Sequence, residues 1–207
     1  MYSTEEVKEN YKSLSDSKIV SLAQNESKSL RKEILSILKD EIEVRNLDKN
    51  LINWVDAETN SFAGLERKDL INKIQNLNCP KCNKTADKLR GFEINTITSF
   101  LIFSNYSRKE KILCNGCGKK EKLYALLITF FAGWWSRQGI FQTPWVIIKD
   151  SVNFIFLEKI SNRIFDRVIN DNTGYLRLKG TEQKTLSNLI KKINGKEVLE
   201  DDGFDFD

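Results

Sequence analysis

The feature that most constrains this chain is the placing of its four cysteines, which form two Cys-x-x-Cys pairs separated by 31 residues. Two residues between cysteines let one tight turn aim both sulfurs at the same metal ion, and two such turns supply the four ligands of a tetrahedral site. A shell of four thiolates leaves no coordination position for a substrate, so the metal is expected to be structural. The spacing therefore predicts one structural Zn²⁺ held by Cys79, Cys82, Cys114 and Cys117.

Two other interpretations of the cysteines stay open. Iron accepts the same thiolate ligands, and either pair alone could work as a redox dithiol. Two pairs that flank one short segment favour a shared metal over redox chemistry. In each turn the residue after the second cysteine often needs a left-handed backbone, and Asn83 and Gly118 are residue types that enter that conformation readily.

Composition argues against most kinds of catalysis. The chain has no histidine, so it can form neither a Ser–His or Cys–His catalytic pair nor a histidine metal ligand. No Gly-rich phosphate loop, paired-carboxylate motif or nucleophile signature is present either. We therefore expect a protein that is not an enzyme and has no small-molecule substrate. The polar start lacks the apolar core of a secretory signal, so we expect it in the cytoplasm or peripherally on the inner face of the membrane.

Residue patterning predicts an α+β fold in three parts followed by a tail. Helical periodicity predicts a helical module over residues 1–78, with Ser3 or Thr4 and Ser15 or Asp16 as the first two N-caps. Between the cysteine pairs, β-branched and aromatic residues predict a small antiparallel sheet with a turn at residues 105–107, so residues 79–122 form a four-cysteine zinc ribbon. Residues 123–195 predict an apolar helical hairpin and C-terminal helices, and residues 196–207 an acidic flexible tail.

The apolar segment over residues 123–148 predicts two helices joined by a tight connection, with Pro144 at the start of the second. A polar stretch at residues 136–138 interrupts it, so it falls short of the about 20 apolar residues that a membrane-spanning helix needs. Tryptophan favours sites that are apolar on one side and wet on the other, at partner and membrane interfaces alike. Those near the connection either fill the core of a compact domain or form a docking surface: Trp134, Trp135 and Trp145.

Charge is unevenly spread along the chain. From Cys79 to Lys122 there are ten Lys or Arg and four acids, whereas the last eleven residues hold six acids and no base. The basic segment suits an anionic membrane surface, or nucleic acid as the alternative partner. Some aromatic side chains would stack on bases if exposed: Phe92, Phe100, Phe103 and Tyr106. Phe204 and Phe206 make the acidic tail a candidate docking peptide, or a mask for the basic segment.

The cysteine pairs, the strand-forming run at residues 98–103, Gly133-Trp-Trp135 and Thr143-Pro-Trp145 make the chain similar to a group of uncharacterised bacterial zinc-ribbon proteins. In that group a Gly-Trp-Trp-containing apolar hairpin follows the ribbon. The group's usual fourth residue is Gly, where this chain has Ser136. The resemblance implies a fold and no activity. We therefore expect a non-enzymatic zinc-ribbon protein that acts as a protein-interaction or membrane-surface module, with nucleic-acid binding as the alternative.

Overall fold

The computed structural model describes residues 3–85, 87–101 and 103–195. Within these ranges the chain is mixed α and β and mostly helical, with ten α-helices, one 3₁₀ turn and one two-stranded antiparallel sheet. The described chain forms two compact units, residues 3–63 with 169–181 and residues 64–168 with 182–195. Both boundaries expected at residues 79 and 123 lie inside the second unit. The expected acidic tail, with Phe204 and Phe206, lies outside the described residues.

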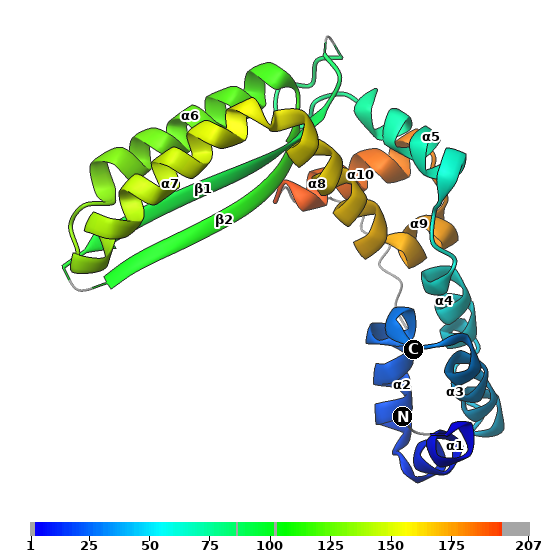
Figure 1. The fold of residues 1–207 in the computed structure, drawn as a ribbon. Helices are drawn as coiled ribbons and strands as arrows, with labels where there is room; N and C mark the ends of the chain where they lie inside the picture. The colour runs from blue at the N-terminus through cyan, green and yellow to red at the C-terminus, as the bar shows by residue number, and fades with distance from the viewer. Residues whose placement is uncertain (1–2, 86, 102, 196–207) are drawn as a thin grey trace. The chain divides into compact units, whose positions relative to one another are not determined.

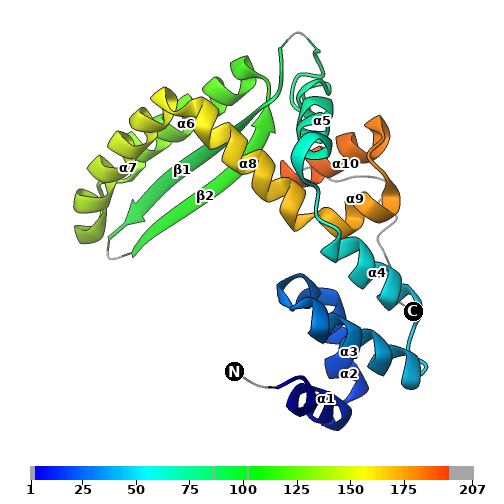
Figure 2. The ribbon, with the colours of Figure 1, turned by 45° about the vertical axis from the view of Figure 1, so that its right-hand side comes forward.

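The first unit is a small helical bundle (Figure 2). It contains α1 (Thr4–Ser13), α2 (Asp16–Asn25), the 3₁₀ turn η1 (Ser27–Ser29), α3 (Lys32–Val44), α4 (Asn50–Thr59) and α9 (Thr173–Lys179). Ser3 and Ser15 cap α1 and α2, because their hydroxyls accept hydrogen bonds from backbone N–H groups inside the first turn. Apolar stripes on the first four helices form its core, and they include Ile19, Leu38, Ile42 and Val55.

The second unit carries the cysteines and the sheet. It contains α5 (Gly64–Gln75), β1 (Arg90–Phe100), β2 (Phe103–Leu113), α6 (Asn115–Ala132), α7 (Arg137–Ile155), most of α8 (Leu157–Asp171) and α10 (Gln183–Ile193). In Figures 1 and 2, α6 and α7 run alongside the two strands over most of their length. We call β1, β2, α6 and α7 together the arm.

The register of the sheet decides which side chains share a face. β1 pairs with β2 so that Glu93 lies opposite Glu110, Asn95 opposite Arg108 and Ile97 opposite Tyr106. Because side chains alternate along a strand, these six side chains point to one face of the sheet. α7 covers that face, as shown by contacts of its Lys149 with Glu93 and of its Asp150 with Asn95. α6 lies along the outer edge of β1, where Thr129 Oγ1 accepts a 3.1 Å hydrogen bond from the Ile97 N–H.

Two local predictions are wrong. Residues 105–107 do not turn, because each pairs with a residue of β1 (96–98) inside the long strand β2, and the chain reverses after Phe100 instead. Pro144 does not begin a helix, because α7 begins at Arg137, where the Ser136 hydroxyl accepts a hydrogen bond from the Gly139 N–H. A proline inside a helix removes one backbone hydrogen bond.

Candidate metal centre and apolar arm

The four cysteine sulfurs meet in one cluster. All four Sγ atoms lie within 4.8 Å of one another, and Cys82 Sγ lies 3.8 Å from Cys114 Sγ. A tetrahedral Zn²⁺ with bonds of about 2.3 Å separates its sulfur ligands by about 3.8 Å. The arrangement therefore fits a single metal ion bound by all four cysteines, as the spacing predicted.

The two pairs are held by different local structures. After Cys79, Asn83 adopts a left-handed backbone with φ of 58°, as expected, and its N–H donates to the Cys79 carbonyl at 2.8 Å. The second pair does not form such a turn, so the expectation for Gly118 is wrong. Cys114 is instead the N-cap of α6 and Cys117 lies in its first turn, where the helix dipole favours a thiolate. Gly118 is required for packing, because a Cβ there would lie 2.1 Å from the ring of Phe92.

The sulfurs perturb one another's protonation. Burial alone would raise the pKa of Cys79, but backbone N–H groups of Cys114, Cys82 and Lys81 lower that pKa to about 7. Burial and the neighbouring sulfurs of Cys114 and Cys82 together raise the pKa of Cys117 to about 12. Sulfurs packed so closely resist ionising together, and a divalent cation among them reverses that effect because it stabilises every thiolate.

The surface of the arm is apolar. Among the described residues, every large hydrophobic side chain that is exposed lies between residues 100 and 156, apart from Val44 and Leu65. Within this stretch lie the three tryptophans singled out from the sequence, and Trp135 and Trp145 are 70% and 69% exposed. Trp134 is less exposed, at 40%. These side chains therefore do not fill the core of this unit.

The buried faces of the two helices of the arm are made mostly of small and polar residues. The buried positions of its two helices recur every three or four residues: Gly118, Lys122, Ala125 and Thr129 on α6, and Gly139, Thr143, Val146 and Asp150 on α7. A Cβ at Gly139 would lie 2.0 Å from the carbonyl oxygen of Gly133, the C-cap of α6, so the backbones touch where the two helices connect. Helices in membranes pack in this way, through small residues and polar contacts. In the described residues, no helix has the length and apolarity needed to cross a bilayer.

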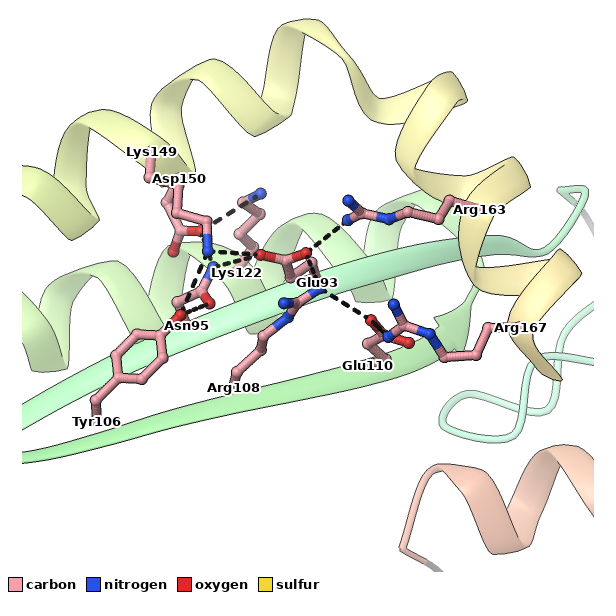
Figure 3. Close-up of polar contacts among 10 residues, drawn as sticks. All are labelled: Glu93, Asn95, Tyr106, Arg108, Glu110, Lys122, Lys149, Asp150, Arg163 and Arg167. Atoms are coloured by element: carbon pink, nitrogen blue, oxygen red, sulfur yellow. Dashed lines mark hydrogen bonds and ion pairs between the residues drawn. The ribbon is translucent and has the colours of Figure 1, made fainter. Parts of the chain in front are cut away.

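A buried carboxylate organises the polar face of the sheet (Figure 3). Glu93 accepts hydrogen bonds from Arg108 at 2.8 Å and from Arg163 of α8 at 2.7 Å, and it forms an ion pair with Lys149 at 3.1 Å. Burial would raise the pKa of Glu93, but the hydrogen bond and charge of Lys149, with help from Asn95 and Arg108, hold this pKa below its usual value. Glu110, on the same face, pairs with Arg167 of α8.

A second buried charge pair lies beside the first. Lys122 of α6 and Asp150 of α7 are both almost completely buried, and Lys122 Nζ lies 3.8 Å from Asp150 Oδ1. Asn95 donates to the same oxygen at 2.7 Å and accepts a 2.6 Å hydrogen bond from the Tyr106 hydroxyl. Burial raises the pKa of Asp150 and lowers that of Lys122, because each charge is removed from water.

Sequence reasoning missed this polar network. A signal for it exists in the alternation of Glu93, Asn95 and Ile97 along β1, and in Asp150 as the only acid between residues 123 and 157. Polar residues are usually assigned to the surface of a protein. That assignment fails for α6 and α7, which expose apolar side chains and bury polar ones.

Comparison with known proteins adds no relative. No family model matches the chain, and neither curated proteins nor solved structures match it significantly. The similarity to zinc-ribbon proteins therefore stays a prediction.

Proposed function

We propose that this chain is a non-enzymatic module that binds to the surface of an anionic membrane, with a structural Zn²⁺ at the base of the apolar arm. The observation that carries the proposal is the concentration of exposed apolar side chains on the arm. Contiguous apolar patches on a soluble protein rarely exceed a few hundred Å², and larger ones mark a surface that something covers.

The distribution of these side chains favours a bilayer over a single protein partner. They line the outer faces of both helices from Leu123 to Phe156, so the apolar surface extends along the whole arm. An 18-residue helix is about 27 Å long, which suits an element that lies in the plane of the membrane interface. The small and polar residues on the buried faces of α6 and α7 match the way in which helices pack in lipid.

Charge on the arm points to anionic lipid. Between residues 123 and 157 the only acid is Asp150, which is completely buried, so this stretch presents no carboxylate to a membrane. Arg137 is exposed at the connection between the helices, and Lys119 and Lys120 are exposed near the start of α6. Each basic residue near an anionic surface contributes about 1 kcal/mol.

The metal has a mechanical role in this proposal. We take Zn²⁺ as the ion because four thiolates in a closed tetrahedral shell suit it best. Bound by the four cysteines, the ion would link the turn after α5 to the first turn of α6. It would thereby fix the end of the arm at which β2 ends and α6 begins. Lys81, which pairs with Glu121, also interacts electrostatically with Cys117 and Cys79, so it compensates part of the thiolate charge.

Nucleic-acid binding is less well supported. Of the four aromatic residues expected to stack on bases, Phe92 is buried against Gly118, whereas Phe100, Phe103 and Tyr106 are exposed. Several cations of the basic segment are also paired within the chain, including Arg108 with Glu93 and Lys81 with Glu121. A binding assay with single-stranded DNA at low and high salt serves as a specificity control for the membrane test.

Vesicle flotation tests the proposal. We expect the metal-loaded protein to float with vesicles that contain anionic lipid and to float less with purely zwitterionic vesicles. A Phe131→Ser/Phe141→Ser variant should lose at least about tenfold in partitioning, because burial of each ring contributes about 1.5–3 kcal/mol. The matched control is Val44→Ser/Leu65→Ser, which removes two large exposed hydrophobic residues of the described chain that lie outside the arm and should leave flotation unchanged. No flotation of the wild type at low salt, or equal losses in both double variants, would refute membrane binding.

A further inference from the structure

The outer edge of β2 is open over residues 104–110. In an antiparallel pair, residues alternate between those that bond to the partner strand and those whose N–H and C=O point away from it. The Ile97 N–H donates to Thr129 and the Ile112 N–H donates to Asn194, both outside the strand pair. Ile97 and Ile112 therefore point their backbone groups away from the partner strand. With the observed register, four residues of β2 therefore point their backbone groups outward between the turn and Ile112: Ser104, Tyr106, Arg108 and Glu110.

Several other outward backbone groups of the sheet have hydrogen-bond partners. On β1, the Gly91 N–H donates to Ser161 Oγ at 2.9 Å and the Ile97 N–H to Thr129. On β2, the Asn194 amide bonds both the N–H and the C=O of Ile112, each at 3.0 Å. In the part of the chain that the structure describes, no residue bonds the outward backbone groups of residues 104–110. A row of unpaired strand groups is a template for another strand.

We propose that β2 of a second copy of this chain pairs with this edge, antiparallel, with Ser107 of one copy opposite Ser107 of the other. In this register Ser104 lies opposite Glu110 and Tyr106 opposite Arg108, so every outward residue of one copy meets an outward residue of the other. Each of the four pairs exchanges two hydrogen bonds, which makes about eight in all. The pairing ends where Asn194 covers Ile112.

The side chains agree with a copy of the same chain as the occupant. No like charges lie directly opposite in this register, because Asn105 faces Lys109 and Phe103 faces Lys111 on the other face of the sheet. The two-fold axis is perpendicular to the sheet, so the polar faces of both copies, with their α7 helices, lie on the same side. Both apolar helix pairs can then meet one membrane, although the strand pairing does not depend on membrane binding.

Sedimentation equilibrium of the full-length, metal-loaded protein in a mild non-ionic detergent tests the pairing, because detergent covers the apolar helices and leaves the strand edge. We expect a dimer in the micromolar range. Ser104→Pro removes one outward N–H and blocks the edge without touching the bonds to β1, so it should give a monomer. Ser104→Ala, which keeps the N–H, is the matched control and should stay a dimer. A monomeric wild type, or a Ser104→Pro protein that dimerises as the wild type does, overturns the proposal.

A charge pair tests the register even if the proline variant folds poorly. Asn105→Asp places a carboxylate opposite Lys109 of the second copy and should tighten the dimer roughly 2- to 5-fold, whereas Asn105→Lys should weaken it by a similar factor. Equal dissociation constants for the two variants overturn this register. The two proposals fail separately, because Ser104→Pro should still float with vesicles and Phe131→Ser/Phe141→Ser should still dimerise in detergent.

Discussion

Lys122 Nζ lies 3.8 Å from Asp150 Oδ1, and the two residues join α6 to α7 inside the arm with almost no contact with solvent. Each charge of such a buried pair compensates the other, so removal of either one leaves an uncompensated charge in the interior. The same pair shows that polar residues lie on the buried faces of α6 and α7, whose exposed faces are apolar.

A double-mutant cycle on this pair should show strong coupling. We expect Lys122→Met alone to lower the free energy of unfolding by about 3–5 kcal/mol, because it leaves the Asp150 carboxylate buried without a cation. Lys122→Met/Asp150→Asn removes both charges and keeps the Asn95 hydrogen bond, so it should be more stable than Lys122→Met. Denaturant unfolding of the wild type, Lys122→Met, Asp150→Asn and the double variant measures the coupling. A double variant whose loss of unfolding free energy equals the sum of the two single losses contradicts it.

The Glu93 carboxylate should stabilise the fold only when ionised. Its pKa in the folded protein lies below the usual value, so its contribution is present above the unfolded pKa of about 4.3 and is lost as pH falls through the lowered folded pKa. Glu93→Gln should therefore cost stability at pH 7, and this cost should shrink below about pH 4. The measurement is the difference in unfolding free energy between the two proteins at each pH. Release of the metal in acid affects both proteins alike, so it cancels in this difference. A difference in unfolding free energy that does not change with pH would contradict the role of the ionised Glu93.

The metal cluster should hold one Zn²⁺ per chain. We expect elemental analysis of protein purified under reducing conditions to give a 1:1 ratio, and Cys82→Ser to lower it sharply and destabilise the protein, because a structural site contributes to folding directly. Lys84→Ser, an exposed position in the same turn, is the control and should keep the metal. Metal-free wild type, or iron in place of zinc, would refute the assignment.

Gly118 and Gly116 offer a matched pair of substitutions in the first turn of α6. A Cβ at Gly118 would meet the Phe92 ring at 2.1 Å, whereas a Cβ at Gly116 has nothing within 4 Å. Gly118→Ala should therefore destabilise the protein by about 1–3 kcal/mol through overpacking. Gly116→Ala should be neutral or stabilising by up to about 1 kcal/mol, because alanine favours the helix. Thermal unfolding of both variants checks this, and equal effects would contradict the packing of Phe92.

Local signals in the sequence predicted the parts of the fold that depend on neighbouring residues. Ser3 and Ser15 were each one of two cap candidates, and the structure shows that they are the caps; it also confirms the left-handed Asn83. All three features follow from side-chain chemistry within a few residues. The meeting of the two cysteine pairs also followed from spacing, because a shared metal was the simplest use of two such pairs.

Features that depend on distant contacts could not be predicted in the same way. Gly118 looked like a turn residue, but its role is set by the ring of Phe92, which lies 26 positions earlier in the chain. The burial of Glu93 depends on cations from β2, α7 and α8 that no local pattern connects. The helices of the arm also invert the usual rule for amphipathic helices, because their exposed faces are apolar. The apolar run therefore predicted two helices there without telling which face of each is buried.

The tryptophans of the arm give the most direct test of membrane binding. Trp54→Phe removes the fourth tryptophan, which lies in the first unit, and leaves Trp134, Trp135 and Trp145 as the reporters. We predict that anionic vesicles shift their emission to the blue, and that lipids brominated near the headgroup quench them more than lipids brominated at the chain ends, as for an element lying in the interface. Emission that stays unchanged when anionic vesicles are added at low salt would contradict the account.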